Sequence, residues 1–257
     1  MHFCSFDVET TGLEAGSRII EIAAIKRDIA TGNVLDTFCE FVNPQMPVPE
    51  DVRQVNGINP EWLVGAHHAG PVLDRWLAFI AGSAFLTAHF APYDVGITSW
   101  ELDRWALKHP DMPVVDTCEL AKAVKETPNN KLPTLVQHYG ITTSGDAHRA
   151  QADAEACASY YLLASKLAKP VSRTWQPDHR YVKPVELPKH LRDLPDLVAE
   201  GKPFPFEYTD AEGTKSHRTI TPYGWSAVKG ALMFHGLCHT RGERRTFRAD
   251  RVDGAAA

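Results

Sequence analysis

Two acidic side chains near the N-terminus, Asp7 and Glu9, stand two residues apart within an apolar stretch. Residues at this spacing share one face of an extended strand, with their Cα atoms about 6.5 Å apart. Two carboxylates this close together can bind a divalent cation. The alternative is a solvated strand face. Phe3 and Ser5 share that face, however, and residues 10–13 form a turn pattern rather than a charged surface run.

A third carboxylate, Asp153, lies on a helix predicted over 148–168. The stripe at helical spacing consists of Asp153, Cys157, Tyr160, Ala164 and Leu167. The acid therefore heads an apolar face, where a charge needs a counter-ion, a proton or a metal. The alternative is an acid that favours the first turns of its helix through the helix dipole. The same explanation covers Asp94, which follows the helix start Pro92-Tyr93.

Together, the four carboxylates Asp7, Glu9, Asp94 and Asp153 can hold two divalent cations. Hard oxygen ligands suit Mg²⁺ or Mn²⁺. Two such ions about 3.5–4 Å apart clamp the attacking and leaving oxygens of a phosphoryl transfer. His148, five residues before Asp153, can remove a proton from water near neutral pH. A lone histidine is more often structural, so His148 gains its interest from the acids around it.

The elements that must position these groups alternate along the first part of the chain. Strands are predicted at 2–9, 18–27, 34–42, 84–88 and 113–116. Helices are predicted at 50–55, after 60, and at 71–81, 93–108, 117–125, 132–139 and 148–168. The first three strands form an antiparallel meander. Strands followed by alternation with helices predict an α/β fold, a mixed sheet flanked by helices.

The pattern changes from Lys169 onward. Prolines recur between 170 and 205, which indicates a Pro-rich linker over 169–202. Short strands are then predicted at 204–210, 216–221, 230–239 and 244–252, with turn residues between them. The predicted organisation is a domain at 1–168, the linker, and a small all-β module at 203–253.

The charge divides along the same line. Residues 1–168 carry 12 Lys+Arg against 21 Asp+Glu, and residues 169–257 carry 15 against 11. The second part is therefore the better surface for a polyanion. No apolar run approaches the roughly 20 residues of a membrane span, and the N-terminus lacks a signal-peptide pattern. Five cysteines without a CxxC pair argue against a disulfide scaffold or a structural zinc site and fit a reducing cytoplasm.

Three segments of the first part carry a family resemblance. In order, they are Phe6-Asp7-Val8-Glu9-Thr10-Thr11-Gly12-Leu13, His89-Phe90-Ala91-Pro92-Tyr93-Asp94 and His148-Arg149-Ala150-Gln151-Ala152-Asp153-Ala154. They resemble the three motifs of the DEDDh 3′→5′ exonucleases, with exodeoxyribonuclease X and the proofreading subunit of bacterial replicative DNA polymerase as the nearest kin. The resemblance covers about residues 1–168 and implies a ribonuclease-H-like mixed sheet.

The resemblance also implies a role for each site residue. Asp7 would bridge both metal ions. Glu9 and Asp153 would hold the ion that carries the nucleophilic water. Asp94 would support the second ion, and His148 would be the general base.

Substrate contacts are implied as well. They fall on the turn Thr10, Thr11, Gly12 and Leu13, on Asn56, Gly57 and Ile58, and on His89 and Phe90. Two of these positions depart from the family. Phe90 stands where Asn is common, so that stacking would replace a polar contact, and Asn56 stands where His is usual.

The C-terminal part has its own charge pattern. Residues 215–251 hold eight Lys+Arg against two acids. Arginines interleaved with aromatics on a small sheet can bind phosphates and stack bases, and a solvated edge strand is the alternative. The segments 218–222 and 242–251 resemble a WYL domain, an SH3-like β-barrel, although Leu232-Met233-Phe234 replaces the Trp-Tyr-Leu triplet. The resemblance implies contact with single-stranded DNA or an oligonucleotide through Arg218, Arg245 and Arg248.

The sequence therefore predicts a metal-dependent 3′→5′ exonuclease that hydrolyses terminal phosphodiesters of single-stranded DNA to nucleoside 5′-monophosphates. One alternative is an exoribonuclease of the RNase T or oligoribonuclease type, which acts on RNA. Another is a nucleic-acid-sensing regulator that works through the WYL-like module, against which the five intact site residues argue. No membrane association is expected, and no clamp-binding peptide identifies a protein partner.

Overall fold

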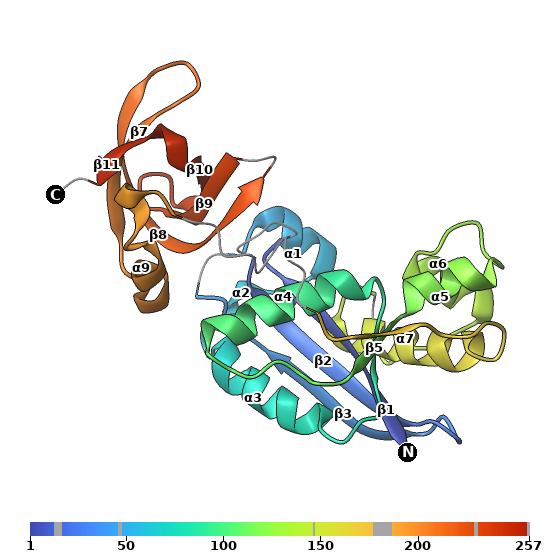
Figure 1. The fold of residues 1–257 in the computed structure, drawn as a ribbon. Helices are drawn as coiled ribbons and strands as arrows, with labels where there is room; N and C mark the ends of the chain where they lie inside the picture. The colour runs from blue at the N-terminus through green and yellow to red at the C-terminus, as the bar shows by residue number, and fades with distance from the viewer. Residues whose placement is uncertain (13–16, 46–47, 146, 177–186, 229–230, 256–257) are drawn as a thin grey trace. The chain divides into compact units, whose positions relative to one another are not determined.

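The chain divides into two compact units (Figure 1). The computed structural model describes residues 1–12, 17–45, 48–145, 147–176, 187–228 and 231–255. The first unit comprises residues 1–12 and 18–178, and the second comprises residues 13–17 and 179–257. Each unit has its own hydrophobic core.

The first unit is built on a six-stranded mixed sheet in the order β3-β2-β1-β4-β5-β6. The strands β1 (His2–Thr10), β2 (Ile19–Asp28) and β3 (Val34–Phe41) form the predicted antiparallel meander. The strands β4 (Leu86–Ala88) and β5 (Pro113–Asp116) add in parallel to β1. The predicted mixed α/β sheet is therefore confirmed.

Helices cover both faces of this sheet. They are α1 (Glu50–Asn56), α2 (Pro60–Val64), α3 (Ala69–Ile80), α4 (Ala91–Arg104), α5 (Thr117–Val124), α6 (Leu132–Tyr139) and α7 (Ala150–Ala164). Alternation along β1 sends Phe6 towards Trp76 of α3 and Phe3 towards Tyr161 of α7, with ring centroids 5.4 and 5.0 Å apart. Asp7 shares the face of Phe3, so α7 lies over the acids.

Part of the stretch expected to be a linker belongs to the first unit. The strand β6 (Ser172–Thr174) pairs antiparallel with β5. Directly after it, the buried Trp175 packs on Phe6 and donates its indole N–H to Ser99 Oγ at 3.0 Å. The first unit therefore extends beyond the expected end at residue 168, to Asp178.

The rest of that stretch contributes to the second unit. A short 3₁₀ turn, η1 (Lys189–Leu191), and the helix α9 (Leu194–Glu200) supply Leu191, Leu194 and Val198 to its core. Prolines at 188 and 195 stand at the starts of these elements, where the missing N–H costs nothing. Within the described residues, the proline-rich composition therefore marks element starts rather than a free tether.

The second unit is a curled antiparallel sheet in the order β10-β9-β8-β7-β11 (Figure 1). Its strands are β7 (Phe204–Thr209), β8 (Lys215–Val228), β9 (Ala231–Cys238), β10 (Glu243–Arg248) and β11 (Val252–Ala255), with η2 (Ala249–Arg251) before the last. The all-β module is confirmed. It has five strands rather than four, and β8 continues through Pro222 because the β8–β9 register shifts between Pro222 and Gly224.

The described parts of the chain contain no helix that is long and apolar enough to cross a membrane.

Candidate active site

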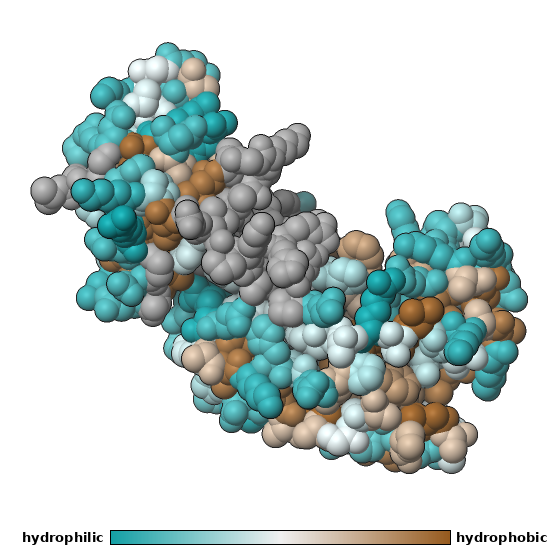
Figure 2. Space-filling view, in the orientation of Figure 1, coloured by the Kyte–Doolittle hydropathy of each residue, from teal (hydrophilic) through white to brown (hydrophobic). Residues whose placement is uncertain are grey.

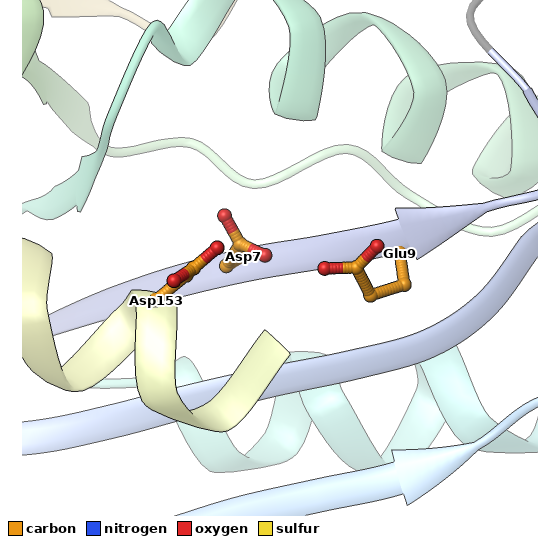
Figure 3. A group of neighbouring side chains, drawn as sticks. All are labelled: Asp7, Glu9 and Asp153. Carbon is orange, nitrogen blue, oxygen red and sulfur yellow. The ribbon is translucent and has the colours of Figure 1, made fainter. Parts of the chain in front are cut away.

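Three acidic side chains converge over the middle of the first sheet. Asp7 and Glu9 project from β1 and Asp153 projects from the first turn of α7 (Figure 3). One carboxylate oxygen of each lies within 4.8 Å of one oxygen of each of the others. All three residues are half-buried. Hard oxygen donors gathered in this way suit a divalent cation such as Mg²⁺ or Mn²⁺.

The three acids repel one another. Burial, followed by the charges of Asp94, Glu9 and Asp153, raises the pKa of Asp7 well above its usual range. Burial and the charge of Asp153 raise the pKa of Glu9 to about 8. Burial also raises the pKa of Asp153. Each carboxylate therefore holds a proton more readily than an ordinary one, and a bound cation would offset this effect, which suits a metal site.

Asp94 lies beside this group and outside it. The side chain sits in the first turn of α4, is buried, and accepts a hydrogen bond from the Val8 backbone N–H at 3.3 Å. Burial raises its pKa well above the usual value, and the Val8 hydrogen bond opposes this shift. Val8, which lies between Asp7 and Glu9, thus connects Asp94 to strand β1.

His148 stands two residues before α7, in the left-handed backbone region at φ 61°, with an exposed side chain. The charge of a protonated His148 and the hydrogen bond from its backbone N–H both lower the pKa of Asp153, against the larger effect of burial. A non-glycine residue in this region is strained and is held there by its surroundings. The imidazole is open to solvent and lies near Asp153.

Asn56, at the end of α1, holds one of the acids. Its side chain hydrogen-bonds to Glu9, which lowers the pKa of that carboxyl. Its Oδ1 accepts from the Ile58 backbone N–H at 3.0 Å, across the left-handed Gly57 (φ 67°). The structure thus places the residue predicted to contact substrate directly against a predicted metal ligand.

The turn after Glu9 is held by helix α4. Thr10 Oγ1 lies 2.6 Å from the hydroxyl of Tyr93, and both hydroxyls donate to the carbonyl of Gly12, at 2.7 and 3.0 Å. The buried Thr11 exchanges hydrogen bonds with the Arg18 backbone. Leu13, the last residue predicted for this turn, lies outside the described residues. Tyr93, which precedes Asp94, was not among the predicted site residues.

The two motif residues before α4 differ in their surroundings. Nε2 of His89 donates to the Asn130 carbonyl at 2.8 Å, and Nδ1 lies 3.0 Å from Thr117 Oγ1. Burial lowers the pKa of this imidazole. Phe90 is 52% exposed and adopts φ 65°, with its N–H donating to Asp116. Phe90 is therefore the member of the pair with a free aromatic surface.

A cavity of about 360 Å³ lies along α1 and α2. It is lined by Glu50, Arg53, Gln54, Gly57, Ile58, Asn59 and Trp62. Trp62 is 49% exposed, and its ring lies 5.7 Å from that of Phe41. The sequence reasoning missed Trp62, because an aromatic residue on a short helix gives no signal of its own.

The predicted arginines of the second unit carry local partners. Arg248 makes two hydrogen bonds to Asp250, at 2.9 and 2.6 Å, and Arg245 bonds to Glu243 at 2.9 Å. Arg218 donates to Ser216 at 3.1 Å. Phe247 is buried against Phe206 and Phe234, so it cannot stack a base. Hydrophilic residues dominate the visible described surface of this unit (Figure 2).

Comparisons with known proteins place the unit that carries the six-stranded mixed sheet in a known family. The family model described as "Exonuclease" (RNase T type) matches residues 4–161, and the WYL domain model matches residues 189–257. The chain belongs to this exonuclease family and carries a WYL domain at its C-terminal end.

The curated relatives are much longer proteins. A DNA polymerase III PolC-type from Halalkalibacterium halodurans is 38% identical over 156 residues, which make up 60% of this chain and 11% of that protein. The same protein from Latilactobacillus sakei is 38% identical over 160 residues, again 11% of its length. The chain therefore spans about a tenth of the length of these relatives.

Solved structures show the same fold. The nuclease domain of 3′hExo, a DEDDh family member bound to rAMP, aligns with a TM-score of 0.59 at 17% identity, over 69% of this chain and 97% of that one. Exonuclease X in complex with 5′ overhanging duplex DNA aligns with a TM-score of 0.51 at 20% identity, over 64% and 91%. These likenesses confirm the predicted RNase-H-like fold, and the family model confirms the exonuclease family. This family uses divalent metal ions.

Proposed function

We propose that the protein is a 3′→5′ exonuclease that removes nucleotides from the 3′ end of single-stranded DNA as nucleoside 5′-monophosphates. The observation that carries the proposal is the convergence of Asp7, Glu9 and Asp153, each with a raised pKa, beside the buried Asp94. Carboxylates held together at this cost in self-repulsion fit a site that binds cations.

Divalent cations fit this donor set. Asp7, Glu9 and Asp153 would hold one Mg²⁺ or Mn²⁺, and Asp7 with Asp94 would hold a second. Bound ions would activate the attacking water and offset the charge that develops on the scissile phosphate. The residues of this chain fix the ligand oxygens: Asn56 orients Glu9, and the Val8 N–H orients Asp94.

His148 would take the proton from the attacking water. The imidazole is exposed beside Asp153 and precedes the helix that carries this acid, so it can meet a nucleotide that arrives from solvent. A neutral imidazole is an effective base near neutral pH. The left-handed backbone at His148 sets the direction in which the ring leaves the chain.

The terminal nucleotides would lie between the two exposed aromatic side chains of this region. Phe90 offers a ring beside the motif that carries Asp94, and Trp62 offers another in the cavity next to Gly57 and Ile58. Base–aromatic stacking is tolerant of sequence and is typical of single-strand binding. The turn of Thr10 to Gly12, braced by Tyr93, would close the site around the terminal residue.

The second unit would hold the strand further from the cut. Arg218, Arg245 and Arg248 are the predicted phosphate contacts. The pairs Arg245–Glu243 and Arg248–Asp250 are exposed. Exposed pairs contribute little free energy, so a phosphate can replace the acid at small cost.

The test uses one single-stranded sequence as DNA and as RNA, labelled at either end, with Mg²⁺, Mn²⁺ or EDTA. The proposal predicts a ladder that shortens from the 3′ end of the 5′-labelled DNA, nucleoside 5′-monophosphate products by mass spectrometry, and no reaction in EDTA. Faster hydrolysis of RNA would overturn the choice of DNA. Cleavage from the 5′ end, or none with any metal, would overturn the exonuclease assignment.

A further inference from the structure

One buried acid near the site has no part in the chemistry described so far. Glu21 lies on β2, opposite Glu9 in the β1–β2 register, and its side chain is 1% exposed. Both of its carboxylate oxygens are engaged. Arg149 donates to them at 3.1 and 2.6 Å, and the Ala150 backbone N–H donates at 2.9 Å. Glu21 is therefore not a member of the group formed by Asp7, Glu9 and Asp153, although its charge lies close to that group.

These bonds reach the start of helix α7. Ala150 is its first residue, and Arg149 precedes it without a capping hydrogen bond from its own side chain. The first N–H groups of a helix need acceptors, and a negative charge is favourable there. Glu21, 129 residues away in the chain, supplies both. A strand of the sheet thus caps the helix that carries Asp153.

The packing of α7 gives this cap a particular importance. The residues of α7 that are buried against the rest of the unit are mostly alanines: Ala150, Ala152, Ala154, Ala156, Ala158 and Ala164. Small, similar side chains pack closely but offer little shape to fix a helix along its axis. A shift by one residue moves every group on the helix by about 1.5 Å, which is enough to remove Asp153 from the acid group.

A second polar anchor lies on the same strand face. Arg27, six residues after Glu21, donates to Ser159 Oγ at 3.1 Å in the C-terminal half of α7. The negatively charged Glu21 lies at the N-terminal end of α7, and the positively charged Arg27 lies towards its C-terminal end, as the helix dipole favours. The two anchors on β2 together define where α7 lies along the sheet.

We propose that Glu21 is a positioning residue. Through Arg149 and the Ala150 N–H it fixes the start of α7 on the sheet, and so holds Asp153 and His148 against Asp7 and Glu9. This inference rests on the proposed function, because it concerns the geometry of that same site. Arg149 is further fixed by Phe41, whose ring centroid lies 5.4 Å from its guanidinium carbon.

The test removes the pair without changing the net charge. In the full chain, Glu21→Met with Arg149→Met replaces both groups by apolar side chains of similar length, which a folded protein often tolerates. The matched control is Glu40→Met with Arg75→Met, an exposed pair of the same residue types between β3 and α3. The readouts are kcat and KM on a single-stranded oligonucleotide, Mn²⁺ affinity by electron paramagnetic resonance without DNA, and circular dichroism.

Positioning predicts a kcat about 10–100-fold lower and a clearly weaker Mn²⁺ affinity, with KM and the fold little changed. The control pair should match the wild type. Wild-type kcat and Mn²⁺ affinity in the double variant would overturn the proposal, because the position of Asp153 would then not depend on the Glu21–Arg149 pair.

Glu21→Asp covers the case in which the double variant does not fold. It keeps the charge and shortens the side chain by one methylene. The proposal therefore predicts a lower kcat with KM little changed, by a smaller factor than in the double variant. An unchanged Glu21→Asp variant would contradict the proposal. If the wild type degrades no nucleic acid, the proposed function fails, while Mn²⁺ affinity in these variants still decides the role of Glu21.

Discussion

Charged groups are held in opposite ways in the two units. In the first unit, Asp7, Glu9 and Asp153 are half-buried and face one another. Burial raises the pKa of each, and the charges of neighbouring acids add to the shift at Asp7 and Glu9. In the second unit, Arg245 and Arg248 are exposed and each has an acid two residues away in the chain. The acids of the first unit would gain from a bound cation, whereas these two arginines have ion-pair partners within the chain.

This difference indicates where binding specificity resides. A group of like charges destabilises the fold unless it is used, so its presence points to a cation. Exposed ion pairs are common surface features and cost little to make or break. The first unit should therefore dominate catalysis, and the second should adjust affinity for long strands.

The largest expected effect is at the acids. Asp7→Asn removes one ligand charge at the centre of the group, and hydrolysis should fall about a thousandfold or more while binding of single-stranded DNA persists. The measurement is initial rate with Mg²⁺ alongside a fluorescence anisotropy titration. Asp74→Asn, at an exposed acid of α3, is the control. Substantial activity in Asp7→Asn would show that Asp7 is not a required metal ligand.

His148→Gln should lower kcat by about a hundredfold or more, because no other side chain is assigned to accept the proton. The Mn²⁺ affinity should change much less, since His148 is not among the three converging acids. In the wild type, kcat should fall as the solution is acidified and the imidazole becomes protonated. A pH–rate profile that is the same in the variant would assign the proton transfer elsewhere.

The stability of the metal-free protein should depend on pH in a defined direction. Because the folded state raises the pKa of Asp7, Glu9, Asp94 and Asp153, it binds more protons than the unfolded chain. The free energy of unfolding therefore decreases as pH rises from the ordinary carboxyl range towards the pKa of about 8 at Glu9.

Thermal unfolding in EDTA between pH 5 and 8.5 measures this effect, with Tm falling by about 2–4 °C for each kcal/mol of stability that is removed. Mg²⁺ should abolish most of the decline, and Glu9→Gln should reduce it. A Tm that rises over this range in EDTA would show that the acids do not repel one another in the folded protein.

The smallest effect is expected in the second unit. Arg245→Gln with Arg248→Gln should weaken binding of long single strands and reduce the log–log salt slope by about 0.7 for each phosphate that the variant no longer binds. Very short oligonucleotides should be cut at the wild-type rate. Arg75→Gln, at an equally exposed paired arginine of the first unit, is the control. A salt dependence in the double variant equal to that of the wild type would show that Arg245 and Arg248 do not bind phosphate.

Much of this arrangement could be predicted from local sequence. The alternation along β1 placed Asp7 and Glu9 on one face, and the helical stripe placed Asp153 on the buried face of its helix. The same stripe predicted the buried positions of Cys157, Tyr160 and Ala164. It failed at Leu167, which is 55% exposed because α7 ends at Ala164.

The remaining features depend on contacts between distant parts of the chain. Glu21 stands in an apolar strand as an unexplained acid, and its partner is 128 residues away. Trp175 lies within the proline-rich stretch and nevertheless packs in the first core. Phe247 alternates with arginines, and only the packing of the second sheet shows that its ring is buried. Periodicity predicts which face a side chain occupies, whereas tertiary contacts decide what covers that face.

The central claim is that the acid group binds divalent cations, and calorimetric titration of the metal-free protein with Mn²⁺ tests it most directly. Measured in two buffers of different ionisation enthalpy, binding should release protons, because the raised pKa values leave part of the group protonated near pH 7. Asp153→Asn should weaken binding strongly, and Asp74→Asn should leave it unchanged. Binding that releases no protons and is unaffected by Asp153→Asn, or no binding at all, would contradict the account.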